Sequence, residues 1–169
     1  MRNTLDTAMD TQNRIDFLIR SLDLLPHPEG GYYRETYRSE ILHDTPSGKR
    51  NLSTCIFFLL TSENVSHFHR IKSDELWFWH EGSSLLIHLL GDKGHEILKL
   101  GPVDGKGCLP QQLVKAGILF GSTLEDANSY ALVSCTVAPG FDFADFELFK
   151  AEDLLKDFPD EEEIIRRLT

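Results

Sequence analysis

Short runs of β-branched and aromatic residues, separated by turn-forming residues, dominate the sequence. The runs are YYRETYRS, STCIFFLLTS, LWFW, SSLLIHLL, HEILKLG, QQLVKAGILFGS and SYALVSCTVAPG. The segments between them are PSGKR, EGS, GDKG, GPVDGKG and TLEDANS. Such runs have the length and composition of β-strands. Many short strands at near-regular spacing, with no helical pattern between them, predict an all-β antiparallel sandwich or barrel.

Helical patterns occur only near the two ends of the chain. Four apolar residues with the spacing of one helical face open the folded part: Ile15, Leu18, Ile19 and Leu22. The tail KAEDLLKDFPDEEEIIRRLT predicts one or two short surface helices divided at Pro159. Residues 1–12 are mostly polar and predict a flexible N-terminal arm, so we expect a single domain over residues 13–169.

The charge of the chain argues against two classes of partner. There are 27 Asp and Glu against 17 Lys and Arg, which gives a net charge of -10. Nucleic acid and anionic membranes require a positive surface, so we expect neither as a partner. Three cysteines without CxxC spacing indicate reduced thiols and a cytoplasmic protein. The N-terminus has no apolar signal-peptide core, and no run is long enough to span a bilayer.

The segment SHFHRIKSDELWFWHEG carries the residues best suited to chemistry. Side chains alternate faces along a strand, so His67 and His69 lie on the same side. Two imidazoles can converge on a divalent transition metal, and a carboxylate such as Glu75 would complete a three-ligand site. The alternative is a proton-transfer site that uses the same three residues without a metal.

The same segment resembles the first signature of the cupin superfamily. In that signature two His separated by one residue precede a Glu, and a Gly follows the Glu after six more residues. His67, His69, Glu75 and Gly82 occupy these places. The interval between the second His and the Glu is longer here than is usual in the family. Asp74 would restore that interval, but the Glu-to-Gly spacing favours Glu75.

The second cupin signature falls in LVKAGILFGS, where it departs from the family. Lys115 stands where Pro is usual, Gly117 matches, and Phe120 occupies the position of the fourth metal ligand. The resemblance therefore implies a site with three ligands at most. It leaves open whether the cofactor is a divalent transition metal or whether there is none.

Two further blocks, HPEGGYYRETYRS and LVSCTVAPGFDFADFELF, extend the resemblance to a small branch of the cupins, a domain of unknown function. Together the blocks cover most of the chain from about Pro26 to Phe158. The resemblance implies a double-stranded β-helix, or jelly-roll β-sandwich, that is usually a homodimer. This shape is related to the dTDP-sugar 3,5-epimerases and the plant storage globulins.

Candidate ligand-binding residues lie around these motifs. In YYRETYRS, strand alternation places Tyr33, Glu35 and Tyr37 on one face, and Arg34 and Arg38 on the other. A twofold period does not say which face lines a pocket. We take Tyr33 and Glu35 as substrate-binding candidates, because Glu35 stands among aromatic residues. Two aromatic residues beside the signature strands complete the set: Trp77 and Phe120.

Three functions are compatible with this pattern, all with a small-molecule ligand in the pocket. The first is a metal-dependent dioxygenase or isomerase built on His67, His69 and Glu75. The second is a metal-free sugar or nucleotide-sugar epimerase or isomerase. In it one of the two histidines, oriented by a carboxylate, is the base, and Tyr130 or Tyr33 is the acid. The third is a metabolite-binding module without catalysis.

Overall fold

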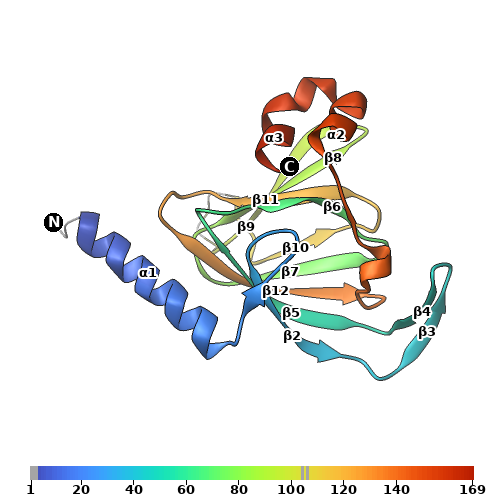
Figure 1. Cartoon of the computed structure of the whole chain (residues 1–169), viewed down its shortest axis with the longest axis horizontal. Helices are drawn as coiled ribbons and strands as arrows, with labels where there is room; N and C mark the ends of the chain where they lie inside the picture. The colour runs from blue at the N-terminus through green and yellow to red at the C-terminus, as the bar shows by residue number, and fades with distance from the viewer. Residues whose placement is uncertain (1–3, 104, 106) are drawn as a thin grey trace.

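The computed structural model describes residues 4–103, 105 and 107–169. Two antiparallel sheets pack face to face, and the helices lie outside them (Figure 1). The elements are α1 (Thr4–Ser21), β1 (Leu25–Pro26), β2 (Tyr32–Arg38), β3 (Leu42–Thr45), β4 (Gly48–Asn51), β5 (Thr54–Thr61), β6 (Ser66–Arg70), β7 (Asp74–Gly82), β8 (Leu85–Gly91), β9 (Gly94–Leu100), β10 (Gln111–Val114), β11 (Leu119–Leu124), β12 (Tyr130–Ala138), η1 (Phe143–Asp145), β13 (Glu147–Leu148), α2 (Ala151–Asp157), η2 (Pro159–Glu161) and α3 (Glu162–Arg167).

From β5 to β13 most successive strands cross from one sheet to the other, as they do in a jelly roll, whereas β8 and β9 are neighbours in one sheet. One sheet has the order β1-β2-β5-β12-β7-β10, and the other has the order β13-β6-β11-β8-β9. The strands β3 and β4 form a separate hairpin that projects from the sandwich (Figure 1). This is the predicted all-β sandwich, with an N-terminal helix and short helices at the C-terminal end.

Apolar side chains form three layers, because strand side chains alternate between the two faces of each sheet. Along β5, Phe58 and Leu60 belong to the core between the sheets, while Leu59 packs with α1 on the outer face. On the other sheet, Phe68 of β6 packs outward against the C-terminal helices, in a cluster that includes Leu154. The inward faces of both sheets therefore enclose one interior space.

Two boundaries differ from the sequence prediction. The run QQLVKAGILFGS is not one strand but two, β10 and β11, which lie in different sheets. Gly117 makes the break between them with a φ of +79°, a conformation that favours glycine. Helix α1 begins at Thr4, so residues 4–12, predicted to be an arm, continue the helix. That segment has no Pro or Gly to stop a helix. Within the described residues, no helix is long and apolar enough to cross a membrane.

Candidate functional site

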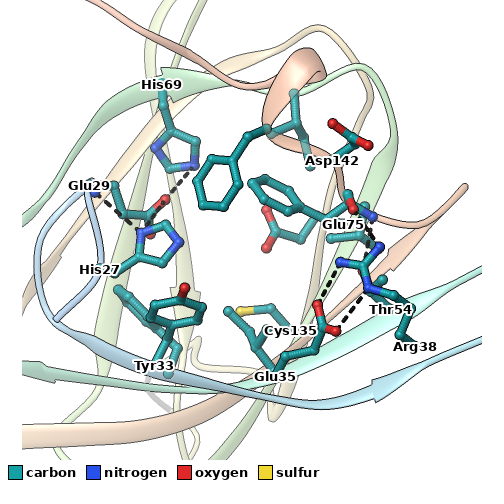
Figure 2. A pocket seen from close by; sticks show the side chains of 16 residues that line it. His27, Glu29, Tyr33, Glu35, Arg38, Thr54, His69, Glu75, Cys135 and Asp142 are labelled. Atoms are coloured by element: carbon teal, nitrogen blue, oxygen red, sulfur yellow. Dashed lines mark hydrogen bonds and ion pairs between the residues drawn. The ribbon is translucent and has the colours of Figure 1, made fainter. Parts of the chain in front are cut away.

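A cavity of about 510 Å³ opens at one end of the space between the sheets. Strands β2, β5, β6, β7 and β12 supply its walls, together with the loop before β2 and the segment after β12 (Figure 2). Figure 2 labels the ten lining residues that carry polar side-chain atoms or sulfur. The remaining lining residues are apolar: Ile56, Phe58, Ile71, Val137, Phe141 and Phe143. This mixture and volume are typical of small-molecule sites.

The loop His27-Pro28-Glu29-Gly30-Gly31 brings a carboxyl group into the cavity wall. Gly30 and Gly31 have φ values of +108° and +70°, in the region that favours glycine. A Cβ atom at Gly30 would overlap the carbonyl oxygen of Val65, so only glycine allows the loop to lie against the start of β6. The paired glycines of the sequence thus set the position of Glu29.

Glu29 makes most of the hydrogen bonds between this loop and β6. Its backbone carbonyl accepts from the backbone N–H of His67 at 2.7 Å and contacts His67 Nδ1 at 2.6 Å. Its backbone N–H donates to His27 Nδ1 at 3.2 Å. Its carboxylate Oε1 accepts from the Ser66 hydroxyl at 3.0 Å. These hydrogen bonds hold the Glu29 side chain in one orientation. Glu29 is also buried, at 7% exposure.

His69 lies between two acceptors. Its Nδ1 is 2.7 Å from the carbonyl oxygen of His67, and its Nε2 is 3.2 Å from Glu29 Oε2. A carbonyl oxygen can only accept, so Nδ1 carries a hydrogen. A close contact between Nε2 and the Glu29 carboxyl then requires one proton shared by the two groups. Burial lowers the pKa of His69 to about 4 and raises that of Glu29, and both shifts favour the form of the pair in which neither group is charged.

His27 presents a hydrogen-bond donor to the cavity. Its Nδ1 accepts from the Glu29 backbone, so Nε2 carries the hydrogen of the neutral ring. Burial lowers the pKa of His27, which favours this neutral form. Figure 2 shows the second ring nitrogen turned towards the cavity. The Tyr33 ring meets the imidazole edge-on, with centroids 4.5 Å apart, and fixes its plane.

Glu75 of β7 faces His27, Glu29 and His69 from the opposite wall of the cavity (Figure 2). It is 7% exposed, and burial together with the charge of Glu29 raises its pKa to about 8. The Trp77 indole and the Cys135 thiol lie beside the carboxyl and reduce that rise. Glu75 is therefore mostly protonated at neutral pH. Its pKa lies close enough to neutrality for the carboxyl to take up and release a proton.

The mouth of the cavity is lined by charged groups and phenylalanines. Arg38 forms a two-pronged ion pair with Glu35, at 2.9 and 2.6 Å. Asp142 lies across the opening in Figure 2, next to Phe141 and Phe143 in the chain. This segment is tied to the β3–β4 hairpin, because Asp145 accepts two hydrogen bonds from Arg50 at 2.6 and 2.9 Å.

Comparison with known families decides the classification of this sandwich. The sequence profile of the family described as Cupin superfamily (DUF985) matches residues 16–149. The chain belongs to the cupin superfamily. The predicted jelly-roll fold and the predicted membership of the cupins, in a domain of unknown function, are thus confirmed.

Relatives of this cupin are similar over most of its length. A curated protein of Saccharomyces cerevisiae, YML079W, described as uncharacterised, is 32% identical over 154 residues that span 82% of this chain and 77% of that protein. A solved protein from Shewanella oneidensis is 42% identical, with a TM-score of 0.84, and 91% of this chain matches 96% of that one. A hypothetical protein from Leishmania major is 38% identical, with a TM-score of 0.85 and coverage of 91% and 97%. Oxalate decarboxylase from Bacillus subtilis, at 16% identity and a TM-score of 0.55, shares the fold alone.

The structure of this cupin brings together four of the residues predicted for the site. The four that line the cavity are Tyr33, Glu35, His69 and Glu75. His67 lies behind the wall and positions His69 and the Glu29 loop through hydrogen bonds.

Three predicted residues lie elsewhere. Trp77 and Phe120 are in the packed core beside the cavity, 1% and 0% exposed. Tyr130 is away from the cavity, and its hydroxyl donates to Glu81 at 3.2 Å. The predicted homodimer and the cytoplasmic location stay predictions.

The predicted metal centre does not fit this donor set. His69 has a protein partner on each ring nitrogen, and Nδ1 of His67 is engaged by the Glu29 carbonyl. Across residues 4–103, 105 and 107–169, no three His, Cys, Asp or Glu side chains are grouped to hold a metal ion. The imidazoles of His67 and His69 are thus engaged by the carbonyl oxygens of Glu29 and His67 and by the Glu29 carboxyl, and none of these contacts involves Glu75.

Sequence reasoning missed His27, Glu29, Arg38 and Cys135, all of which line the cavity. The block HPEGG contained the signal for the first two, since it places a histidine and a carboxyl directly before a glycine pair. Arg38 reaches the same side as Glu35 because the register of β2 against β5 shifts between Glu35 and Tyr37. Such a bulge reverses the parity that simple alternation predicts.

Proposed function

We propose that this cupin is a metal-free isomerase or epimerase, and that it moves protons on a small carbonyl compound of the sugar class held in the cavity. The observation that carries the proposal is the pair of proton-carrying groups on opposite walls. One is the Glu29–His69 pair, and the other is Glu75. This corresponds to the second of the three functions compatible with the sequence.

Two such groups suit the inversion of a carbon next to a carbonyl. One group, in its deprotonated form, removes a proton from one face of the carbon, and the other, in its protonated form, delivers a proton to the opposite face. The pKa values of both Glu29 and Glu75 are raised above the usual carboxyl value, Glu75 to about 8. Proton transfer is most efficient when the pKa lies near the working pH. Two carboxyls with ordinary pKa values would both be ionised and could not supply the acid.

His27 and Tyr33 are placed to bind the carbonyl group. The neutral His27 ring directs a hydrogen-bond donor into the cavity. Such a donor stabilises the negative charge that develops on the carbonyl oxygen when a proton leaves the neighbouring carbon. Tyr33, rather than Tyr130, is the tyrosine that lines this space. The buried apolar wall around Phe58 and Ile71 keeps water away from the reacting groups.

Deuterium exchange tests the reaction class without knowledge of the natural substrate. The protein is incubated in heavy water with a panel of aldoses and ketoses, and proton NMR follows loss of the signal next to the carbonyl. We expect Glu29→Gln and Glu75→Gln to lower the exchange rate by at least roughly 100-fold. Glu96→Gln, an exposed carboxyl on β9, is the matched control and should exchange like the wild type.

Exchange that persists in both cavity variants would contradict the assigned roles. Sugars that bind and protect the protein from thermal unfolding, yet never exchange, would instead favour the metabolite-binding module. A metal-dependent reaction would be favoured if exchange appeared only after a divalent transition metal was added.

A further inference from the structure

We propose that the cavity selects a positively charged ligand, a small primary amine, which on the proposed function is an amino sugar or a related amino carbonyl compound. The sugar-like scaffold of the ligand rests on the proposed function. The positive charge of the ligand is inferred independently, from the side chains that line the cavity.

The cavity wall carries more acidic than basic groups. Four carboxyl side chains line it, those of Glu29, Glu35, Glu75 and Asp142, against the single guanidinium of Arg38. The imidazoles do not alter this balance, because burial lowers the pKa of both His27 and His69. Once Arg38 is paired with Glu35, the other three carboxyls face the cavity without a lysine or arginine partner among the described residues.

Arg38 has little capacity left for an anionic ligand. Its Nε and Nη2 atoms donate to Glu35, and Nη1 donates to Asn51 Oδ1 at 2.8 Å and to the Phe141 carbonyl at 3.1 Å. A guanidinium has five N–H donors, and four of them are used in these bonds. The phosphates of a nucleotide sugar would compete with Glu35 for this group and would meet Asp142 at the same opening.

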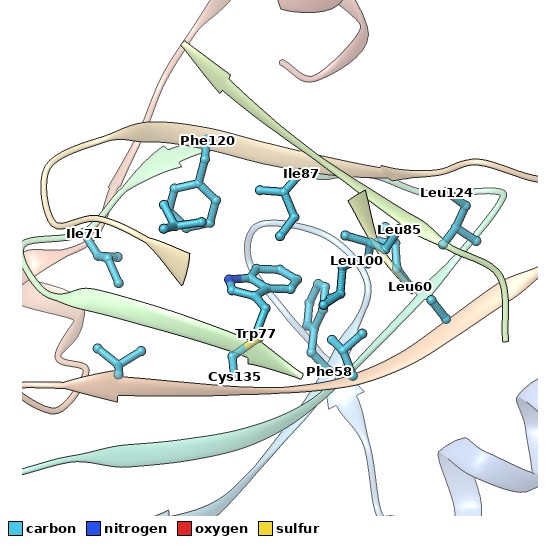
Figure 3. Packing of buried hydrophobic residues seen from close by; sticks show 14 residues of the cluster. Phe58, Leu60, Ile71, Trp77, Leu85, Ile87, Leu100, Phe120, Leu124 and Cys135 are labelled. Carbon is cyan, nitrogen blue, oxygen red and sulfur yellow. The ribbon is translucent and has the colours of Figure 1, made fainter. Parts of the chain in front are cut away.

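Glu75 is the buried carboxyl whose ionised form lacks a charged partner. It is 7% exposed, its carboxyl lies in the cavity wall, and no ion pair reaches it from the described part of the chain. The fully buried Trp77 beside it has an indole N–H without a hydrogen-bond partner (Figure 3). An ammonium group between Glu75 and Glu29 would favour the ionised form of Glu75, and that carboxylate could also accept a hydrogen bond from the Trp77 indole.

Aromatic faces complete the environment that a cation prefers. Tyr33 and Phe58 line the inner part of the cavity, and Phe141 and Phe143 stand at its mouth. The ring faces of these residues carry partial negative charge and attract an ammonium group. A buried carboxylate with aromatic walls favours a cation over a neutral molecule of equal size, and disfavours an anion most.

Isothermal titration with two matched sets of compounds tests the charge preference. One set is glucosamine, glucose and glucuronate, and the other is benzylamine, benzyl alcohol and benzoate. Within at least one set we expect the amine to bind roughly tenfold more tightly than the neutral compound, and the anion to bind most weakly. Glu75→Gln should reduce the affinity for the amine about tenfold and leave the neutral compound within about threefold. Glu96→Gln should change neither.

The outcomes separate this inference from the proposed function. If the neutral or anionic member of each set binds as tightly as the amine, or if none binds at roughly 10 mM, the charge preference is wrong. Exchange of neutral sugars in heavy water would then still support the isomerase. Conversely, amine binding that depends on Glu75 without any proton exchange would leave the charge preference standing and remove the reaction.

Discussion

The two ends of the space between the sheets share the strands β5, β7 and β12 and are used in opposite ways. Figure 3 shows one end filled by Trp77, Phe58 and aliphatic side chains, while Figure 2 shows the other end left open. Along β7, Glu75 and Trp77 point to the same side, one into the cavity and the other into the core. Strand geometry thus decides which residues face inward, and the residues themselves decide whether the space is filled.

The boundary between the two ends passes between β6 and β11. His69 and Phe120 are paired across these strands, and their ring centroids are 4.1 Å apart. Phe120 stands where a complete cupin metal site would carry a fourth ligand, and it packs against Trp77 as part of the core. The aromatic ring therefore extends the packed end up to His69, which is the first polar residue of the open end.

The largest effect should come from opening the packed end. Trp77→Ala removes a side chain that is 1% exposed and leaves a void beside Phe58 and Phe120. We expect the free energy of unfolding to fall by about 3–5 kcal/mol, as measured by denaturant titration. At the cavity mouth Phe143 is 55% exposed, so Phe143→Ala should cost less than about 1 kcal/mol. Equal losses in the two variants would mean that the cavity end is packed as tightly as the core.

The second effect is the pH dependence that Glu75 imposes on stability. Its pKa is about 8 in the folded protein against 4.5 in the unfolded chain. The unfolded chain therefore loses this proton first, so the wild type should lose stability as the pH rises from 4.5 to about 8 and level off above that. Glu75→Gln cannot ionise and should lack this loss.

The comparison requires unfolding free energies of wild type and Glu75→Gln across that range. At about pH 4 the two proteins should be nearly equal, and at about pH 9 the variant should be more stable by roughly 2–4 kcal/mol. Glu96→Gln controls for the removal of an exposed carboxyl and should follow the wild type. A constant difference at every pH would show that the carboxyl at position 75 titrates normally.

The packed end was more predictable from the sequence than the open end. Strand runs such as STCIFFLLTS identified the sheets, because a strand between two apolar layers must be apolar on both faces. The parity of His67 and His69 predicted one shared face, but only His69 of the two lines the cavity, and the pairing of β6 with β11 is irregular between Ser66 and His69. Where a run contained an unrecognised glycine turn, as at Gly117, one expected strand became two in different sheets.

The open end depended on contacts that no local pattern contains. Glu29 reaches His69 only because a glycine-rich loop folds back on a strand that is distant in sequence. Arg38 enters the cavity only because a bulge changes the register of β2. Residues brought together by the strand period were found in advance, whereas those brought together by a loop or a bulge required the structure.

That dependence on the loop gives the third prediction. Gly30→Ala places a Cβ atom against the Val65 carbonyl at a φ of +108°, so the loop must move or the backbone must strain. We expect the free energy of unfolding to fall by roughly 1–3 kcal/mol. Activity should also fall, and more strongly than this loss of stability alone would cause, because Glu29 shifts away from His69. Gly91→Ala is the matched control, since it has open space around it and should be nearly neutral. A Gly30 variant with normal activity would show that the position of Glu29 is not required.

The smallest effects distinguish the two tyrosines that the sequence offered as the acid. The Tyr33 ring lines the cavity beside His27, whereas the Tyr130 hydroxyl bonds to Glu81 away from it. Tyr130→Phe loses one hydrogen bond and should cost about 0.5–1.5 kcal/mol of stability, with deuterium exchange unchanged. Tyr33→Phe should leave stability nearly unchanged and lower the exchange rate roughly tenfold, because only this hydroxyl can reach a bound ligand. If Tyr130→Phe lost exchange while Tyr33→Phe kept it, the reacting groups would lie outside the cavity, and the contrast between an open and a packed end would say nothing about function.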